Sequence, residues 1–320
     1  MQIVFDTKEL KIDRQRGLFR VEAPDGTIRT ISPKKVTSMA VTQSCWFSKE
    51  AIELAALHEI PVYFHDFIGK VTARISAPNF QSIATLRRQQ VLFLQGAEAS
   101  RWVLGLYLLK TQGQTENIDR LQPGQLAVST MKNVAKNAEV YAQLPMDEAG
   151  PKIMAAEAVI AKQYWQALAR WLPAECDFEK RTRRPAADPF NAALNYLYGM
   201  LYTIVENGLF AAGLDPHLGL LHADEYNKPV LAFDFIEPFR PWVDWLLIEQ
   251  FRTGKVHPGF FSKVPGGLAL SKEGKTFFIP LFNAWLRTEK KWSGRNASVK
   301  NHIYQLAGRF TQKLRAPIAP

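Results

Sequence analysis

The sequence predicts an α+β protein of two domains, in which a β-rich N-terminal domain with one short helix precedes a nearly all-α C-terminal domain. Three observations lead to this prediction. The chain has 320 residues, enough for two separate cores. Short alternating apolar runs are confined to about the first 75 residues, and apolar positions at helical spacing fill the rest. We place the domains at 1–80 and 93–320, with a linker at 81–92.

The strands of the N-terminal domain are predicted from runs of alternating apolar and polar residues. Asp25-Gly26 lies between two such runs and predicts a hairpin, because glycine accepts the positive φ of a tight turn. Ser48 is a typical N-cap for a short helix that ends near His58. The predicted strands are 3–5, 18–21, 28–31, 36–41, 61–64 and 70–75.

The C-terminal domain begins after Pro78-Asn79, where the apolar period changes to that of a helix. Asp188-Pro189 supplies an N-cap and a first-turn proline, and Gly213 supplies a C-terminal glycine, so a long helix is expected between them. Other helices are predicted over 91–109, 152–172 and 235–251, with connections at 122–124 and 144–151.

The net charge of +10 is unevenly distributed. From Lys255 to the end there are 12 Lys or Arg and two acids, so the remainder of the chain is balanced. A basic segment of this kind favours contact with phosphates. The first residues lack the pattern of a signal peptide, and no apolar run reaches membrane-spanning length, so we expect a cytoplasmic protein without membrane contact. Two cysteines are too few for a disulfide framework.

The densest group of unusual residues lies between Arg181 and Arg240. Three motifs follow one another there, LNYxYxxL, GLDPxxGxLH ending at His222, and DxxExFRP, and Glu157 lies upstream on a predicted helix before Tyr164-Trp165. In this order and spacing the motifs resemble those of the CRISPR-associated integrase and endonuclease of the spacer-acquisition (adaptation) module, CRISPR-associated protein one. The likeness extends over nearly the whole chain. Alanines flank Glu157 where the family usually has glycine.

This resemblance implies an N-terminal β-sandwich and a helical domain that carries the active site. By position, Glu157, His222 and Glu237 would be catalytic residues and ligands of one metal ion, and Asp234 would be a neighbouring acid or ligand. Asp234 and Glu237 both lie at a plausible spacing for the third ligand, and we prefer Glu237. Two carboxylates and an imidazole suit Mg²⁺ or Mn²⁺, and phosphodiester transfer needs such a cation.

The implied reaction is attack of a 3′-hydroxyl of spacer DNA on a phosphodiester at a CRISPR repeat boundary. The resemblance also implies a homodimer, with two dimers around a dimer of the small second CRISPR-associated adaptation protein in a heterohexamer-like complex. One alternative is a stand-alone structure-selective nuclease or a transposon-type integrase. A second is a basic DNA-binding scaffold without catalysis.

Candidate DNA contacts are basic residues near the motifs and in the C-terminal basic segment, since basic side chains bind phosphates. Trp285 and Trp292 lie among the C-terminal ones and could stack on an unpaired terminal base, although a tryptophan at helical spacing is more often part of a core. The candidates are Arg181, Arg183, Arg184, Arg240, Lys290, Lys291 and Arg295.

Overall fold

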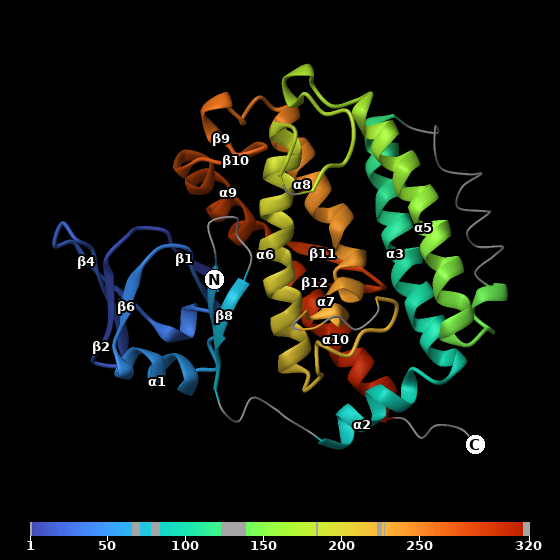
Figure 1. Ribbon diagram of the computed structural model, residues 1–320, viewed down its shortest axis with the longest axis horizontal. Coiled ribbons are helices and arrows are strands. Elements are labelled where there is room, and N and C mark those ends of the chain that lie inside the picture. Colours follow the sequence, from blue (N-terminus) through green and yellow to red (C-terminus); the bar gives the residue numbers. More distant parts are fainter. Residues whose placement is uncertain are drawn as a thin grey trace. The chain divides into compact units, whose positions relative to one another are not determined.

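The computed structural model describes residues 2–65, 71–77, 84–122, 139–183, 185–222, 226 and 228–315. The chain divides into two compact units, Met1–Ser82 and Ile83–Pro320 (Figure 1). The first is rich in strands and the second in helices, which confirms the predicted α+β class. In the described part of the chain, no helix combines the length and apolar character needed to cross a bilayer.

The first unit is a sandwich of two four-stranded sheets. One core lies between them, because Phe5 and Met39 of one sheet and Ile12 and Phe19 of the other belong to a single buried cluster. The predicted sandwich is therefore confirmed. One sheet has the order β1 (Gln2–Phe5), β5 (Ser38–Val41), β7 (Val62–His65), β8 (Val71–Ile75), and the other β4 (Ile28–Ile31), β3 (Leu18–Glu22), β2 (Leu10–Gln15), β6 (Cys45–Phe47).

Two local predictions in this unit are confirmed. β3 and β4 form the expected hairpin, with Gly26 at φ +80° and the Thr27 amide donating to Asp25. Helix α1 (Lys49–Leu57) starts at Ser48, whose hydroxyl accepts the Ala51 amide at 3.1 Å. Strand β2 was not predicted, because only two of its six residues are buried and the others are exposed polar side chains.

The second unit is built from helices around a single large core. It also contains two antiparallel hairpins, so the prediction of a nearly all-α domain is incomplete. The helices are α2 (Ala84–Phe93), α3 (Ala97–Leu121), α5 (Met146–Ala169), α6 (Pro189–Ala211), α7 (Val230–Phe235), α8 (Arg240–Arg252), α9 (Lys272–Trp285) and α10 (Val299–Arg315). Three single 3₁₀ turns of this unit are η2 (Ala174–Cys176), η3 (Glu237–Phe239) and η4 (Pro258–Phe260). Another 3₁₀ turn, η1 (Pro33–Lys35), belongs to the first unit. The hairpins are β9–β10 (Phe261–Val264, Gly267–Leu270) and β11–β12 (Glu289–Trp292, Arg295–Ser298).

Helix α6 is the predicted long helix, and its ends are as expected. Asp188 accepts the Asn191 amide at 2.7 Å, and Gly213 has φ +81°. Leu197 and Leu201 are completely buried, so α6 runs through the core of the unit. The segment 81–92, expected as a linker, contains most of α2, whose Gln90 exchanges two hydrogen bonds with the backbone of Asp215.

Three predicted segments differ from the structure. The helix expected over 91–109 is interrupted, since α2 ends at Phe93 and α3 begins at Ala97. The segment 144–151 is not a connection, since α5 begins at Met146 and includes Pro151, whose missing N–H removes one bond near the helix start. The segment 235–251 is not one helix. It is divided into the end of α7, η3 and α8, because Pro238 and Pro241 interrupt the regular helical hydrogen bonds.

Candidate active site

Three helical elements bring two carboxylates to one ammonium group. Lys110 of α3 forms a very short ion pair with Glu157 of α5, and its Nζ lies 2.5 Å from Oε2 of Glu237 in η3. The Lys110 and Glu237 side chains are only 10% and 7% exposed, whereas Glu157 is 27% exposed. Glu157 is therefore the most solvent-accessible of these three side chains.

A second cation holds the other oxygen of Glu237. Nε of Arg240 donates to Glu237 Oε1 at 2.8 Å, and its guanidinium also donates to the Tyr202 hydroxyl at 2.5 Å. Burial alone would raise the pKa of Glu237, but the charges of Arg240 and Lys110 hold it below its ordinary value. Burial likewise opposes the charge on Lys110, and the two carboxylates overcome it and raise its pKa. The cluster is thus ionised and charge-paired.

The imidazole of His222 is held through its Nδ1 atom by Asp234 of α7. The His222 Nδ1 lies 2.7 Å from Asp234 Oδ1, while Asp234 Oδ2 accepts the backbone amides of Leu220 and Leu221 at 2.8 and 3.2 Å. Asp234 is completely buried and both of its oxygens are occupied. The hydrogen bond to Asp234, with the charges of Asp234 and Glu237, raises the pKa of His222 against the effect of burial.

The turn that carries His222 depends on a glycine. A Cβ at Gly219 would lie 2.3 Å from the carbonyl oxygen of His222 and 3.0 Å from Val230. Only a residue without a side chain lets the chain fold back here. The glycine of the GLDPxxGxLH motif therefore places the imidazole beside Asp234.

The four side chains predicted as metal ligands form two pairs, and members of both pairs act on the same tyrosine. Glu157 is paired with Glu237 through Lys110, and His222 is paired with Asp234. The charges of Glu237, Asp234 and Glu157 all act on buried Tyr107 and, after burial itself, raise its pKa. Among the described residues, no three His, Cys, Asp or Glu side chains are already gathered as a metal site. Asp234 of α7 and Glu237 of η3 are held by different partners, His222 and Lys110.

Another buried acid lies on α8. Asp244 of α8 is 1% exposed, and its carboxylate accepts the hydroxyls of Tyr164 at 2.9 Å and Tyr198 at 2.5 Å. Burial raises its pKa to about 6, against the effect of these hydrogen bonds. The ring of Tyr198 lies 4.6 Å beneath the Arg240 guanidinium, so Asp244 supports the first cluster indirectly.

The predicted DNA contacts lie in different environments. Arg181 points inward, donating to Asn191 and Asn195 at 2.8 and 2.6 Å, and Arg240 belongs to the carboxylate cluster. Lys290 is half-buried over the Trp242 ring. Trp292 packs against Phe239, Trp242 and His302, as expected of a core residue. The exposed candidates are Arg183, Lys291 and Arg295, and Arg184 lies outside the described residues.

Lys110 and Tyr107 were not predicted from the sequence as site residues. A signal was present, because Lys110 falls three or four residues after Leu106 and Tyr107, on the stripe that buries α3. A lysine on a buried stripe needs a carboxylate partner, and that requirement points toward Glu157 or Glu237.

The chain is similar to one protein family over most of its length. The family model described as CRISPR associated protein Cas1 matches residues 3–284. The CRISPR-associated endonuclease Cas1 2 of Saccharolobus solfataricus is 29% identical over 238 residues, covering 74% of this chain and 70% of that protein. The CRISPR-associated endonuclease Cas1 1 of Archaeoglobus fulgidus is 24% identical over 95% of this chain and 93% of its own.

Solved structures share the fold. A CAS1 protein from Thermotoga maritima superposes with a TM-score of 0.84 at 18% identity, covering 100% of this chain and 98% of that one. A casposase bound to integration product has a TM-score of 0.81 at 19% identity, covering 100% and 94%. A Cas6-RT-Cas1–Cas2 complex chain has a TM-score of 0.78 at 20% identity, covering 98% of this chain and 35% of that chain.

A β-sandwich followed by a helical unit is the two-domain fold that this chain shares with these solved structures. The family model extends over most of the sequence. This chain belongs to the CRISPR-associated Cas1 family.

Proposed function

We propose that this chain is a metal-dependent DNA integrase and endonuclease that inserts spacer DNA into a CRISPR array, acting in the cytoplasm. One observation carries the proposal: Glu157 and Glu237 reach a single cation from different helices, with His222 close enough for Glu237 to act on its pKa. Membership of the Cas1 family supports the same chemistry, as does the fold shared with a casposase bound to integration product.

Glu157, His222 and Glu237 would hold one Mg²⁺ or Mn²⁺. The donor set fits, since two carboxylates and an imidazole suit these ions, and the Lys110 ammonium already lies between the two carboxylates. We assign Asp234 to orienting His222 through Nδ1, which leaves Nε2 for the ion. When bound, the ion would neutralise non-bridging phosphate oxygens and orient the attacking oxygen.

The chain's own residues would prepare this site. Arg240 fixes Glu237 through Oε1, and Lys110 keeps a positive charge beside both carboxylates. In the reaction, the 3′-oxygen of the fragment bonds to phosphorus as the bond to the leaving 3′-oxygen of the target strand breaks. The attacking hydroxyl loses a proton and the leaving oxygen gains one. One phosphodiester replaces another, so no nucleotide hydrolysis is required.

The partners belong to the same proposal. We propose that the chain acts as a homodimer on spacer fragments and CRISPR repeat DNA, together with the small second adaptation protein, in a heterohexamer-like complex. The fold likeness to a chain of a Cas6-RT-Cas1–Cas2 complex supports such a partner. A second candidate is a stand-alone, transposon-type integrase, which the casposase likeness favours.

The experiment is a joining assay with purified protein, with and without the small partner. A fragment ending in 3′-hydroxyls is incubated with a repeat-containing plasmid and Mn²⁺, and covalent joining is measured against a fragment ending in 3′-deoxy nucleotides. Joining that needs the 3′-hydroxyl, the repeat and the partner supports the CRISPR integrase. Joining without repeat or partner supports the transposon-type integrase. DNA binding with no joining or cleavage under any metal or partner condition would favour a non-catalytic scaffold.

A further inference from the structure

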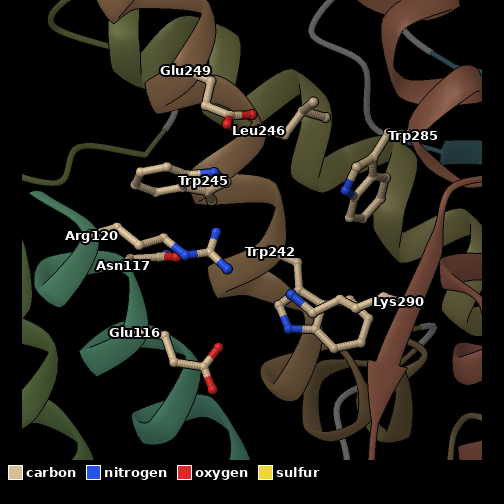
Figure 2. Close-up of a pocket in the computed structure, with 9 residues that line it drawn as sticks. All are labelled: Glu116, Asn117, Arg120, Trp242, Trp245, Leu246, Glu249, Trp285 and Lys290. Atoms are coloured by element: carbon tan, nitrogen blue, oxygen red, sulfur yellow. The ribbon is translucent and has the colours of Figure 1, made fainter. Parts of the chain in front are cut away.

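A pocket in the helical unit lies between α3, α8, α9 and β11, apart from the carboxylate cluster (Figure 2). It is open to solvent and has a cavity volume of about 80 Å³. Three indoles line it, those of Trp242, Trp245 and Trp285. Trp242 is buried, and the part-exposed indoles of Trp245 and Trp285 provide flat apolar surface for a planar ligand.

The charged groups of the pocket are balanced and are not paired with one another. Arg120 lies over the Trp245 ring at 4.8 Å, and Lys290 lies over the Trp242 ring at 4.5 Å. Within the described residues, neither cation has a carboxylate within ion-pair distance, although Glu116 and Glu249 also line the pocket. Glu116 accepts from Gln112 instead, at 3.1 Å. Donors and acceptors therefore both remain available to a ligand.

Several residues that line the pocket are held in place by contacts with other parts of the helical unit. Asn117 donates to the carbonyl oxygen of Pro241 at 2.7 Å, fixing α3 against the start of α8. Trp242 packs against Trp292 at 5.4 Å, and His302 hydrogen bonds the carbonyl oxygen of Lys290 at 2.7 Å. The indoles and the two cations thus project from fixed backbone.

We infer that this pocket binds one unpaired nucleobase of the DNA strand whose phosphodiester lies at the carboxylate cluster, an inference that rests on the proposed function. A nucleobase is planar and carries both donors and acceptors on its edges. It can stack on an indole or on the guanidinium plane of Arg120. A lining with two cations and two carboxylates is suited to a neutral group of this kind rather than to a phosphate or a divalent ion.

The distance along α3 is consistent with one strand reaching both places. Lys110 and Arg120 are ten residues apart on the same helix, which corresponds to about 15 Å. A stacked strand advances about 3.4 Å per nucleotide and an extended one more, so the pocket lies roughly two to four nucleotides from the cluster. The inference therefore predicts that a single base within this range of two to four nucleotides occupies the pocket.

The experiment uses single strands in which 2-aminopurine, whose fluorescence is quenched by stacking, replaces one base at a time from the 3′ end. With the full chain and Mn²⁺, we expect strong quenching at one position. Trp245→Ala should remove it and Trp245→Phe should retain it. Trp46→Ala, at an indole 71% exposed on the other unit, should leave it unchanged. An abasic site at that position should weaken binding about 5- to 100-fold.

Equal quenching at every position, or quenching that Trp245→Ala and Arg120→Ala leave unchanged, would overturn the inference. The joining assay separates this result from failure of the proposed function. If joining occurs without position-specific quenching, the pocket does not bind a base and the proposed integrase function stands. If position-specific quenching occurs without joining, the pocket binds a base and the proposed integrase function is wrong.

Discussion

Two groups of acids in the helical unit differ in what neutralises them. Part-exposed Glu157 and buried Glu237 are paired with Lys110 and Arg240. Asp244 is hydrogen bonded by two tyrosine hydroxyls, and burial raises its pKa to about 6. A metal ion can take the place of an ammonium or guanidinium group beside a carboxylate. It cannot take the place of a hydroxyl that donates a hydrogen bond. Under the proposed function the first group binds the metal ion, whereas Asp244 joins α8 to α5 and α6 through hydrogen bonds to Tyr164 and Tyr198.

The largest expected effect comes from removing the charge of the exposed carboxylate. Glu157→Gln should lower strand joining by about 10³-fold or more, because several kcal/mol of transition-state stabilisation depend on the metal. The joining assay above measures it. Glu148→Gln, at an exposed acid in the first turn of the same helix, should join normally. Joining by Glu157→Gln within tenfold of the unaltered protein would remove Glu157 from the active site.

The next effect concerns the cation between the carboxylates. Lys110→Met should lower the free energy of unfolding by about 3 kcal/mol, since removing one partner of a buried ion pair is costly, although Arg240 still compensates part of the charge of Glu237. Urea unfolding measures this, with the exposed Lys162→Met as control. Mn²⁺ should then stabilise Lys110→Met more than the unaltered protein, because it restores the lost charge. Equal stability without metal would contradict the assignment.

A smaller effect is a pH dependence of stability from Asp244. Its folded pKa of about 6 lies above the ordinary 3.8, so the stability gained from protonation is fully present below pH 3.8 and is lost as pH rises through 6. Relative to Asp244→Asn, the unaltered protein should lose about 2–3 kcal/mol between pH 4 and pH 7. Chemical unfolding of both proteins at several pH values tests this. A constant difference would mean that Asp244 is ionised throughout.

The smallest effect concerns the exposed basic residues. Arg295→Gln should weaken DNA binding at low salt and reduce the slope of log affinity against log salt by about 1, since one phosphate contact is lost. Titrations between 50 and 200 mM salt measure the slope. Arg29→Gln, at an exposed arginine of the β-rich unit, is the control. An unchanged slope for Arg295→Gln would place the DNA elsewhere.

Elements with a local chemical signal were predictable from the sequence. The caps at Ser48 and Asp188 and the hairpin at Asp25-Gly26 depend on neighbouring residues alone, and all three are confirmed. The start of α5 was missed because Pro151 lies inside the helix, where packing outweighs its local preference. The breaks around Glu237 follow from two prolines whose effect depends on how α7 and α8 pack.

The candidate site was predictable only in part. Family motifs led to Glu157, His222, Asp234 and Glu237, but not to how they are paired. The pairing depends on Lys110, which comes from α3 and is separated from Glu157 by 47 residues. Neither the period of the apolar residues nor the spacing of the motifs predicts a contact between residues so far apart in the sequence. The same holds for the pocket, whose indoles come from two helices and whose Lys290 comes from a strand of an unpredicted hairpin.

The close approach of α3 to α8 restricts how this part of the chain can change. A Cβ at Gly113 would lie 2.9 Å from Pro241, so the two helices meet where one residue has no side chain. Gly113 lies between Lys110 and Arg120 on α3. One residue inserted in that interval would turn Arg120 by about 100° around the helix axis relative to Lys110. Related sequences should therefore keep the length of this interval and a glycine at the position of Gly113.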